Sequence, residues 1–334
     1  MLKFDVTHFI IMTYIGIDVS KDSFVAAYPL ENGYRTQTFK NSPMEIRKFI
    51  RTLSKKEHHC VMEATGNYSY LLLYLLSKAE ITTSMENPLK IKSFARAMLS
   101  TTKTDELDAQ MIALYGKRME PAPFKMPTEA IMELKQKRAV IAQFKKQLRM
   151  NQNFKKSIEV LPKVDHATIK SIDRVILSLS KQIRQLEDDL SRITKSVYEK
   201  QMKALTSIKG VGAAIASAII ISTGGFSQFD NAKQVSRYLG LCPTYQQSGT
   251  SVHIKGHINR NGDPSLRSQL YVAAWSASQH NAACHDLYLR MKDKGKPGNV
   301  IMIAVANKMI RQMFAVVKHD CLYQDGFVSQ RKNA

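Results

Sequence analysis

The sequence is poor in cysteine and has no uninterrupted apolar run of the length that crosses a membrane. Its cysteines are Cys60, Cys242, Cys284 and Cys321. They lack the CxxC spacing of thiolate metal sites, and four thiols in 334 residues exclude a disulfide-rich secreted domain. The apolar stretch at residues 9–17 is short and has no small-residue cleavage site, unlike a signal peptide. We therefore expect a cytoplasmic protein with reduced thiols and no membrane-spanning segment.

Acidic residues are scarce relative to basic ones. The chain has 49 Lys and Arg against 28 Asp and Glu, a formal net charge of +21, which is typical of proteins that bind a polyanion. Residues 1–120 contain 16 basic and 13 acidic side chains, residues 130–203 contain 17 and 8, and residues 204–334 contain 15 and 6. This distribution indicates a nearly neutral module followed by two basic ones, as expected of an enzyme that acts on nucleic acid.

Residues 13–120 have the pattern of an α/β domain, and residues 1–12 are interpreted as an N-terminal extension, with Met12 as an alternative start. Strands are predicted at residues 14–19, 23–29, 34–40, 59–63 and 81–86. Helices are predicted at residues 43–53, 68–78, 89–98 and from 105 onward. Three strands in a meander followed by alternating helices and strands is the element order of a ribonuclease H-like domain.

Four carboxylates stand at corresponding ends of these elements. Asp18 and Glu63 each end a predicted strand, while Asp105 and Asp108 lie one turn apart at the start of a helix. Taken alone, the helical pair is explained by a helix start with Thr104 as N-cap and acidic groups that favour the helix dipole. Together, clustered carboxylates need a cation between them, and their oxygens are the ligands that Mg²⁺ or Mn²⁺ prefers. The sequence therefore predicts a divalent metal site formed by these four acids.

Prolines at positions 121, 123 and 127 indicate a linker, after which residues 121–203 are predicted to form a basic coiled-coil region. Between residues 169 and 197, Ile, Leu and Val recur at alternating spacings of three and four, which is a heptad seam. The seam pairs either with the preceding helix at 131–160 or between subunits. Basic side chains on that preceding helix are predicted to be solvated or to contact nucleic acid. They include Lys135, Arg138, Lys145 and Arg149.

Residues 204–334 are predicted to form a mostly helical C-terminal domain that opens with a helix-hairpin-helix-like motif at residues 208–212. Lys209, Gly210 and Gly212 are the candidates for contact with a nucleic-acid backbone there, because glycines let a phosphate approach the N–H groups of the following helix. The alternative is a simple glycine-containing turn into an alanine-rich packing helix.

A polar loop is expected at residues 246–251, with the sequence QQSGTS. No G-x-S-x-G elbow or triad order accompanies it, so the residues alone do not predict a nucleophilic serine. Arg237, Arg260 and Arg267 lie close to this loop in the sequence, and each is either a phosphate clamp or a surface arginine.

Read in order, several short stretches resemble the DEDD transposases of the insertion-sequence group often called the "IS one-ten" family, and the similar Piv-type DNA invertases. The matching stretches are YIGIDV at 14–19, EATG at 63–66, KTD at 103–105 with Asp108-Ala109, residues 208–212, residues 238–241, Ser248-Gly249 with Ser251, and Leu266-Arg267. The resemblance extends from residue 14 to residue 317, with no departure at the family's functional positions.

The resemblance implies a RuvC-like first domain whose D-E-D-D acids are Asp18, Glu63, Asp105 and Asp108. It also implies that Ser248 attacks a DNA phosphate and forms a covalent 5′-phosphoserine link. A structured bridge RNA would choose the element ends and the target DNA. The active unit would be a tetramer, built as a dimer of dimers with contacts through the coiled coil.

Two other functions remain open from the sequence. In a metal-only nuclease or junction resolvase, water would attack the phosphate and Ser248 would be an ordinary loop residue. A non-catalytic nucleic-acid scaffold would keep the nuclease fold without its reaction.

Overall fold

The computed structural model describes residues 12–64, 66–99, 104–248, 252–258 and 262–326. The chain divides into two compact units, Met1–Met126 and Pro127–Ala334. The boundary falls in the proline-containing stretch that the sequence indicates as a linker. The predicted division between residues 203 and 204 lies inside the second unit and stays a prediction.

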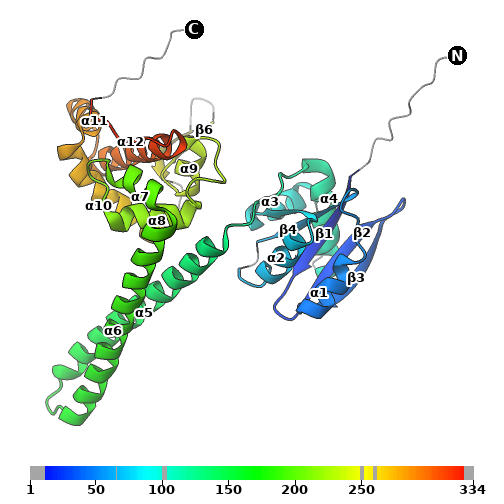
Figure 1. Ribbon diagram of the computed structural model, residues 1–334, viewed down its shortest axis with the longest axis horizontal. Coiled ribbons are helices and arrows are strands. Elements are labelled where there is room, and N and C mark those ends of the chain that lie inside the picture. Colours follow the sequence, from blue (N-terminus) through cyan, green and yellow to red (C-terminus); the bar gives the residue numbers. More distant parts are fainter. Residues whose placement is uncertain (1–11, 65, 100–103, 249–251, 259–261, 327–334) are drawn as a thin grey trace, which may run out of the picture. The chain divides into compact units, whose positions relative to one another are not determined.

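The first unit is built on a five-stranded sheet with the strand order β3-β2-β1-β4-β5 (Figure 1). Strands β1 (Thr13–Val19), β2 (Ser23–Pro29) and β3 (Tyr34–Lys40) form an antiparallel meander. Strands β4 (His58–Glu63) and β5 (Thr82–Glu86) run parallel to β1 on its other side. The apolar first strand is therefore central, as the ribonuclease H-like element order predicts.

Helices cover both faces of this sheet. On one face, α1 (Pro43–Ile50) and α2 (Tyr70–Lys78) bury Phe49 and Leu72 against side chains such as Ile17 and Met62. On the other face lie α3 (Pro88–Ala97) and α4 (Asp105–Met119), where Ile112 packs with Val61. Alternation along β1 and β4 sends successive side chains to these two separate cores.

The second unit begins with two long helices, α5 (Glu129–Glu159) and α6 (His166–Val197), which pair as an antiparallel hairpin (Figure 1). Ion pairs from Lys145 to Glu187 and from Lys155 to Asp173, both at 2.6 Å, connect the two helices. The heptad seam thus pairs with the preceding helix of the same chain. Among the seam residues only Ile183 is buried, with 7% of its surface exposed, because two helices cover a seam from one side only.

The remainder of the second unit is mostly helical. It contains α7 (Glu199–Thr206), α8 (Ala213–Thr223), α9 (Ala232–Tyr238), α10 (Pro264–His280), α11 (Ala282–Asp293) and α12 (Gly298–Lys318). Helices α7 and α8 flank the glycine-containing turn at residues 208–212, as the predicted helix-hairpin-helix-like motif requires. A single apolar core joins α8, α10 and α12.

Helix α12 is long and apolar enough to cross a membrane by length and composition, and it alone passes that test in the described part of the chain. One of its faces, which includes Val305, Met309 and Met313, is buried in the core of the second unit. Core helices commonly meet the same two criteria, so this finding is weak support for a membrane span.

A short antiparallel hairpin was not predicted. Strands β6 (Pro243–Ser248) and β7 (Val252–Ile258) pair with each other, with an irregularity between Thr244 and Gln246. The prediction of a loop is therefore wrong for residues 246–248, which are the end of β6. The misleading feature is composition, since Gln and Ser are not typical strand formers, whereas alternation in the β7 sequence VHIKGHI is a strand signal.

Candidate active site

Three acidic residues end neighbouring parallel strands of the five-stranded sheet. Ile17 of β1 pairs with Met62 of β4, which places Asp18 and Glu63 next along their strands. Glu63 in turn pairs with Glu86 at the end of β5. Because parallel strands present their carboxyl ends at one edge, the three acids form a row along that edge. Two of them, Asp18 and Glu63, are predicted site residues, and both are partly buried.

Helix α4 packs unusually closely on β1, and two glycines make this possible. A Cβ at Gly16 would lie 2.1 Å from the carbonyl oxygen of Ala109 and 2.2 Å from the amide nitrogen of Ala113. Further back, a Cβ at Gly116 would lie 2.9 Å from a methyl group of Val61. The contacts show that α4 runs antiparallel to β1. The first turn of α4 therefore lies at the carboxyl end of β1.

The four predicted acids share one face as well as one edge. Side chains two residues apart on a strand point to the same face, so Asp18 follows Gly16 and Glu63 follows Val61 toward α4. The first turn of α4 supplies Asp105, which is exposed, and Asp108, which is partly buried. Strand register and the direction of α4 thus bring Asp18, Glu63 and the first turn of α4 to one face at one edge of the sheet.

The helix start is also a normal capped terminus. The Thr104 side-chain oxygen accepts a hydrogen bond from the Leu107 amide at 3.2 Å, and acidic residues occupy the first turn. The capping interpretation of this segment is therefore correct, and it is compatible with a site role for the two aspartates. The cap fixes where α4 begins and hence where its acids lie.

Glu86 is an acid at this edge that sequence reasoning missed. Its carboxylate is paired with Lys90 of α3 at 2.7 Å, so its charge is largely compensated. Burial raises the pKa of Tyr115 on α4, and the nearby Glu86 charge raises it further. A signal existed in the sequence, because Glu86 ends a predicted strand as Glu63 does.

The donor set fits a hard divalent cation in its chemistry. Carboxylate oxygens are the usual protein ligands of Mg²⁺, and four of them share one face and edge. In the described part of the chain, however, no three His, Cys, Asp or Glu side chains are gathered closely enough to hold one metal ion. Like-charged carboxylates repel one another when no cation lies between them, so an open arrangement is the physical expectation for the protein alone.

Ser248 belongs to the second unit, where it is the last residue of β6 and pairs through the backbone with Val252. Its side chain, residues 249–251 and the predicted clamp Arg260 lie outside the described part of the structure. Arg237 is exposed on α9. Arg267 lies in the first turn of α10, where its Nη1 is buried and has no hydrogen-bond partner.

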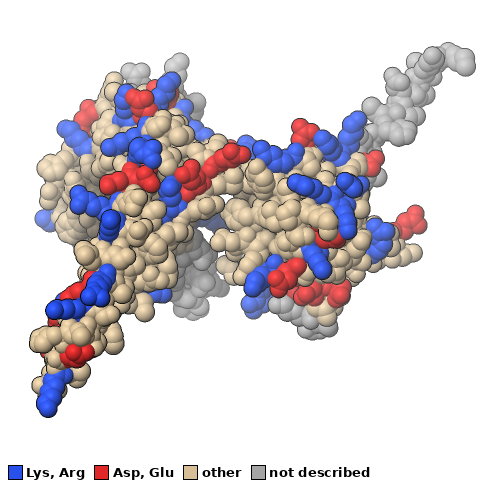
Figure 2. Space-filling model, turned by 60° about the horizontal axis from the view of Figure 1, so that its bottom comes forward, with Lys and Arg blue, Asp and Glu red and all other residues tan. Residues whose placement is uncertain are grey.

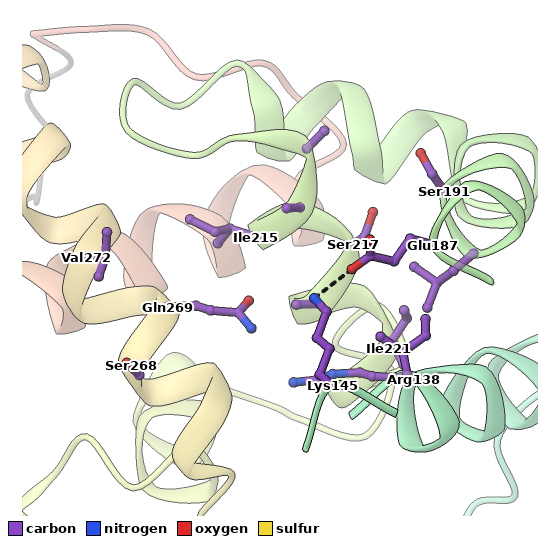
Figure 3. A pocket seen from close by; sticks show the side chains of 15 residues that line it. Arg138, Lys145, Glu187, Ser191, Ile215, Ser217, Ile221, Ser268, Gln269 and Val272 are labelled. Atoms are coloured by element: carbon purple, nitrogen blue, oxygen red, sulfur yellow. Dashed lines mark ion pairs between the residues drawn. The ribbon is translucent and has the colours of Figure 1, made fainter. Parts of the chain in front are cut away.

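Two of the predicted nucleic-acid residues lie at a cleft of about 690 Å³ that is lined by the long helices, α8 and α10 (Figure 3). Gly212 is the N-cap of α8 and supplies no side-chain cap, and Ala213 and Ala214 of the first turn line this cleft. Arg138 and Lys145 also line it. Both cations already have partners, since Arg138 pairs with Asp263 at 2.7 Å and Lys145 with Glu187.

The other predicted contacts are dispersed. Lys135 is half-buried on α5, where desolvation lowers its pKa, whereas Arg149 is exposed near the far end of the same helix. Lys209 forms an ion pair with Asp325 at 2.9 Å. In Figure 2, Lys and Arg side chains are scattered among acidic ones on the visible face of both units. The basic excess is therefore spread over the surface shown rather than concentrated in one patch.

The chain matches two family models in succession. Residues 15–161 match a model of DEDD-type transposases named for IS110, and residues 202–289 match the model described as the transposase IS116/IS110/IS902 family. The first match includes the four predicted acids, and the second includes both the glycine-containing turn and Ser248.

Relatives align over nearly the whole chain. The pilin gene-inverting protein of Moraxella bovis is 28% identical over 316 residues, which cover 92% of this chain and 96% of that protein. The transposase for insertion sequence element IS1111A of Coxiella burnetii is 23% identical over 347 residues, covering 93% and 91%. Among solved structures, T. thermophilus RuvC in complex with a Holliday junction substrate covers 34% of this chain and 98% of its own, with 17% identity and a TM-score of 0.25.

The first model spans most of the first unit and helix α5, and the second model lies within the second unit. Full-length relatives include both a transposase and a DNA-inverting protein. We conclude that this chain belongs to the DEDD-type transposases of the IS116/IS110/IS902 family and is an enzyme of DNA transposition or recombination.

Proposed function

We propose that this chain cuts and rejoins DNA strands at the ends of an insertion sequence, with the acids of the first unit and Ser248 of the second acting on the same phosphate. The observation that carries the proposal is the shared edge of Asp18, Glu63 and the first turn of α4. Register across β1 and β4 and the close approach of α4 at Gly16 support it.

In this proposal Asp18, Glu63, Asp105 and Asp108 hold Mg²⁺ or Mn²⁺. The bound ion would neutralise charge on the scissile phosphate. The chain's own contribution is to fix the four carboxylates on rigid elements, two on strand ends and two on a capped helix. Carboxylates held this way need little reorganisation when DNA arrives.

Ser248 is the proposed nucleophile. Its Oγ would form a bond to phosphorus while the bond from phosphorus to the 3′ oxygen breaks, so that a 5′-phosphoserine and a free 3′ hydroxyl result. The serine proton leaves to a base and the 3′ oxygen takes up a proton. Because the ester keeps the bond energy of the DNA backbone, a new 3′ hydroxyl can reverse the step and join different strands without external energy.

The remaining parts of the proposal concern partners. A bridge RNA would select the element ends and the target, and a tetramer would assemble the active sites from different subunits. Support for an RNA or DNA partner comes from the net charge of +21 and from the uncapped start of α8 beside Arg138 and Lys145. The protein would act in the cytoplasm, on the nucleoid.

A covalent adduct is the test. Purified protein is incubated with radiolabelled element-end DNA, its flanking non-coding RNA and Mg²⁺, then denatured and separated on a gel. We expect labelled protein, with the label lost in Ser248→Ala and kept in Thr250→Ala, which removes a neighbouring hydroxyl. An adduct that persists in Ser248→Ala would refute the serine assignment. Cleavage without any adduct would support the metal-only nuclease, and no cleavage would support the scaffold.

A further inference from the structure

Asp325 forms an ion pair with Lys209, which the sequence predicts to contact a nucleic-acid backbone. One oxygen of its carboxylate lies 2.9 Å from Lys209 Nζ, and the other accepts the backbone N–H of Ala282 at 3.0 Å. The hydrogen bond from Lys209 is the main reason that the pKa of Asp325 is lowered. The carboxylate is therefore charged at neutral pH, and it forms an ion pair with the Lys209 ammonium group in the free protein.

The backbone at Lys209 is held in a fixed position. It precedes Gly210, whose backbone has φ of +94° and where a Cβ would lie 2.8 Å from the Ala277 side chain. Only glycine satisfies both conditions, so the turn is fixed against α10. The carbonyl of Lys209 also accepts a hydrogen bond from Asn281 Nδ2 at 3.5 Å. A cation on this turn has a defined position beside the start of α8.

The segment that carries Asp325 is anchored more strongly than Asp325 itself. The Tyr323 amide donates to Ser207 Oγ at 2.8 Å, which fixes this segment next to the turn. The Tyr323 hydroxyl lies 3.0 Å from Asn281 Oδ1 and 3.1 Å from Asp325 Oδ1. The hydroxyl proton of Tyr323 can be donated to either of these two oxygens. If Asp325 moves away, Tyr323 can therefore still donate to Asn281 Oδ1.

We propose that Asp325 is an intramolecular competitor for nucleic-acid phosphate: it occupies Lys209 in the free protein, and a phosphodiester of bound DNA or RNA displaces it. The proposal rests on the function proposed above. The Lys209 and Asp325 side chains are 55% and 30% exposed, and an ion pair in such surroundings is weak and easily exchanged. A phosphate oxygen accepts from an ammonium group as a carboxylate does, and nucleic acid adds the release of condensed counterions.

The test measures binding of a fluorescent duplex of arbitrary sequence to the full chain by anisotropy, over a series of salt concentrations. Asp325→Asn keeps the shape of the side chain and removes its charge. We expect this variant to bind roughly fivefold more tightly and the slope of log K against log salt to steepen by about one. In the Lys209→Gln background the same substitution is expected to change neither quantity.

Asp286→Asn is the matched control, because it removes the same charge from an exposed position on α11. Equal gains from Asp286→Asn and Asp325→Asn, or a gain that persists without Lys209, would overturn the proposal in favour of a general charge effect. If circular dichroism shows that Asp325→Asn is unfolded, Tyr323→Phe is measured in its place, because it removes a hydrogen bond to Asp325. A smaller gain in affinity is expected from Tyr323→Phe, and no gain would count against the proposal. Failure of the wild type to bind any duplex would instead refute the proposed function.

Discussion

At the scale of single residues, Gly16 decides whether helix α4 can reach the central strand. A Cβ at this position would lie 2.1 Å from backbone oxygen and 2.2 Å from backbone nitrogen of α4, and backbone cannot move aside as a side chain can. The acids of α4 depend on this approach, since they lie one turn beyond the contact.

Gly16→Ala is therefore expected to destabilise the first unit by 3 kcal/mol or more, roughly the upper end for overpacked cores. Thermal denaturation followed by circular dichroism measures the change. Gly298→Ala is the control, because a Cβ there meets nothing within 4 Å, and its melting temperature should stay near that of the wild type. An unchanged melting temperature for Gly16→Ala would contradict the α4 packing described here.

His59 gives the first unit a pH dependence. Its ring stacks on Tyr14, and its Nε2 lies 2.8 Å from Ser84 Oγ, which donates onward to the Pro121 or Ala122 carbonyl. The ring nitrogen therefore acts as the donor to Ser84, which requires an N–H at that position. Burial lowers the pKa of His59 below its usual value.

In the unfolded chain His59 binds a proton at a higher pH than in the folded chain. The free energy of unfolding should therefore fall as pH drops below about 6.5, toward the lowered pKa of His59 in the folded chain. Above the pKa of His59 in the unfolded chain, its contribution to the free energy of unfolding is constant. Urea denaturation between pH 7.5 and 5.5 measures the slope, whose ceiling is about 1.4 kcal/mol per pH unit. The slope should shrink in His59→Gln; an equal slope in both proteins would rule out His59 as its source.

At the scale of elements, the α5–α6 hairpin depends on few fully buried residues. Ile183 lies in the seam and is 7% exposed, whereas Leu177 on the same helix is 72% exposed. Ile183→Ala should cost about 2–4 kcal/mol through lost burial and a cavity, and Leu177→Ala should cost almost nothing. Guanidinium denaturation compares the two variants. A similar loss from both would mean that Leu177 is covered in solution, as in an assembly of several chains.

Elements with strong periodicity could be predicted from the sequence, and those that depend on distant partners could not. The predicted bounds of the strands at residues 23–29 and 34–40 match those of β2 and β3 at both ends. Both signals are local: apolar and polar residues alternate, and Asn32-Gly33 between the strands is a typical hairpin turn. The β6–β7 hairpin was missed, because two polar strands are stabilised mainly by pairing with each other. Of the candidate site, the acids at strand and helix ends were predictable, whereas the Lys90 partner of Glu86 and the Asp325 partner of Lys209 arise from packing.

At the scale of the whole molecule, the groups proposed for chemistry belong to two units. The acids lie in Met1–Met126, and Ser248 lies in Pro127–Ala334, beyond two long helices. The distribution of charged residues along the sequence follows the same division, with most of the basic excess in the second unit. We infer that the first unit supplies the acidic site and that most of the backbone affinity comes from the second.

The central claim of the proposed function is that DNA strand cleavage requires the acidic edge of the sheet. The most direct measurement is the rate of Mg²⁺- or Mn²⁺-dependent cleavage of element-end DNA, with its RNA present, by wild type, Asp18→Asn and Asp22→Asn. Asp22 is exposed in the turn after β1 and matches the change in charge, and it is not one of the four predicted ligands. We expect Asp18→Asn to lose at least about a hundredfold in rate, roughly 2.7 kcal/mol, while Asp22→Asn cuts as the wild type does. Cleavage by Asp18→Asn at the wild-type rate would contradict the account.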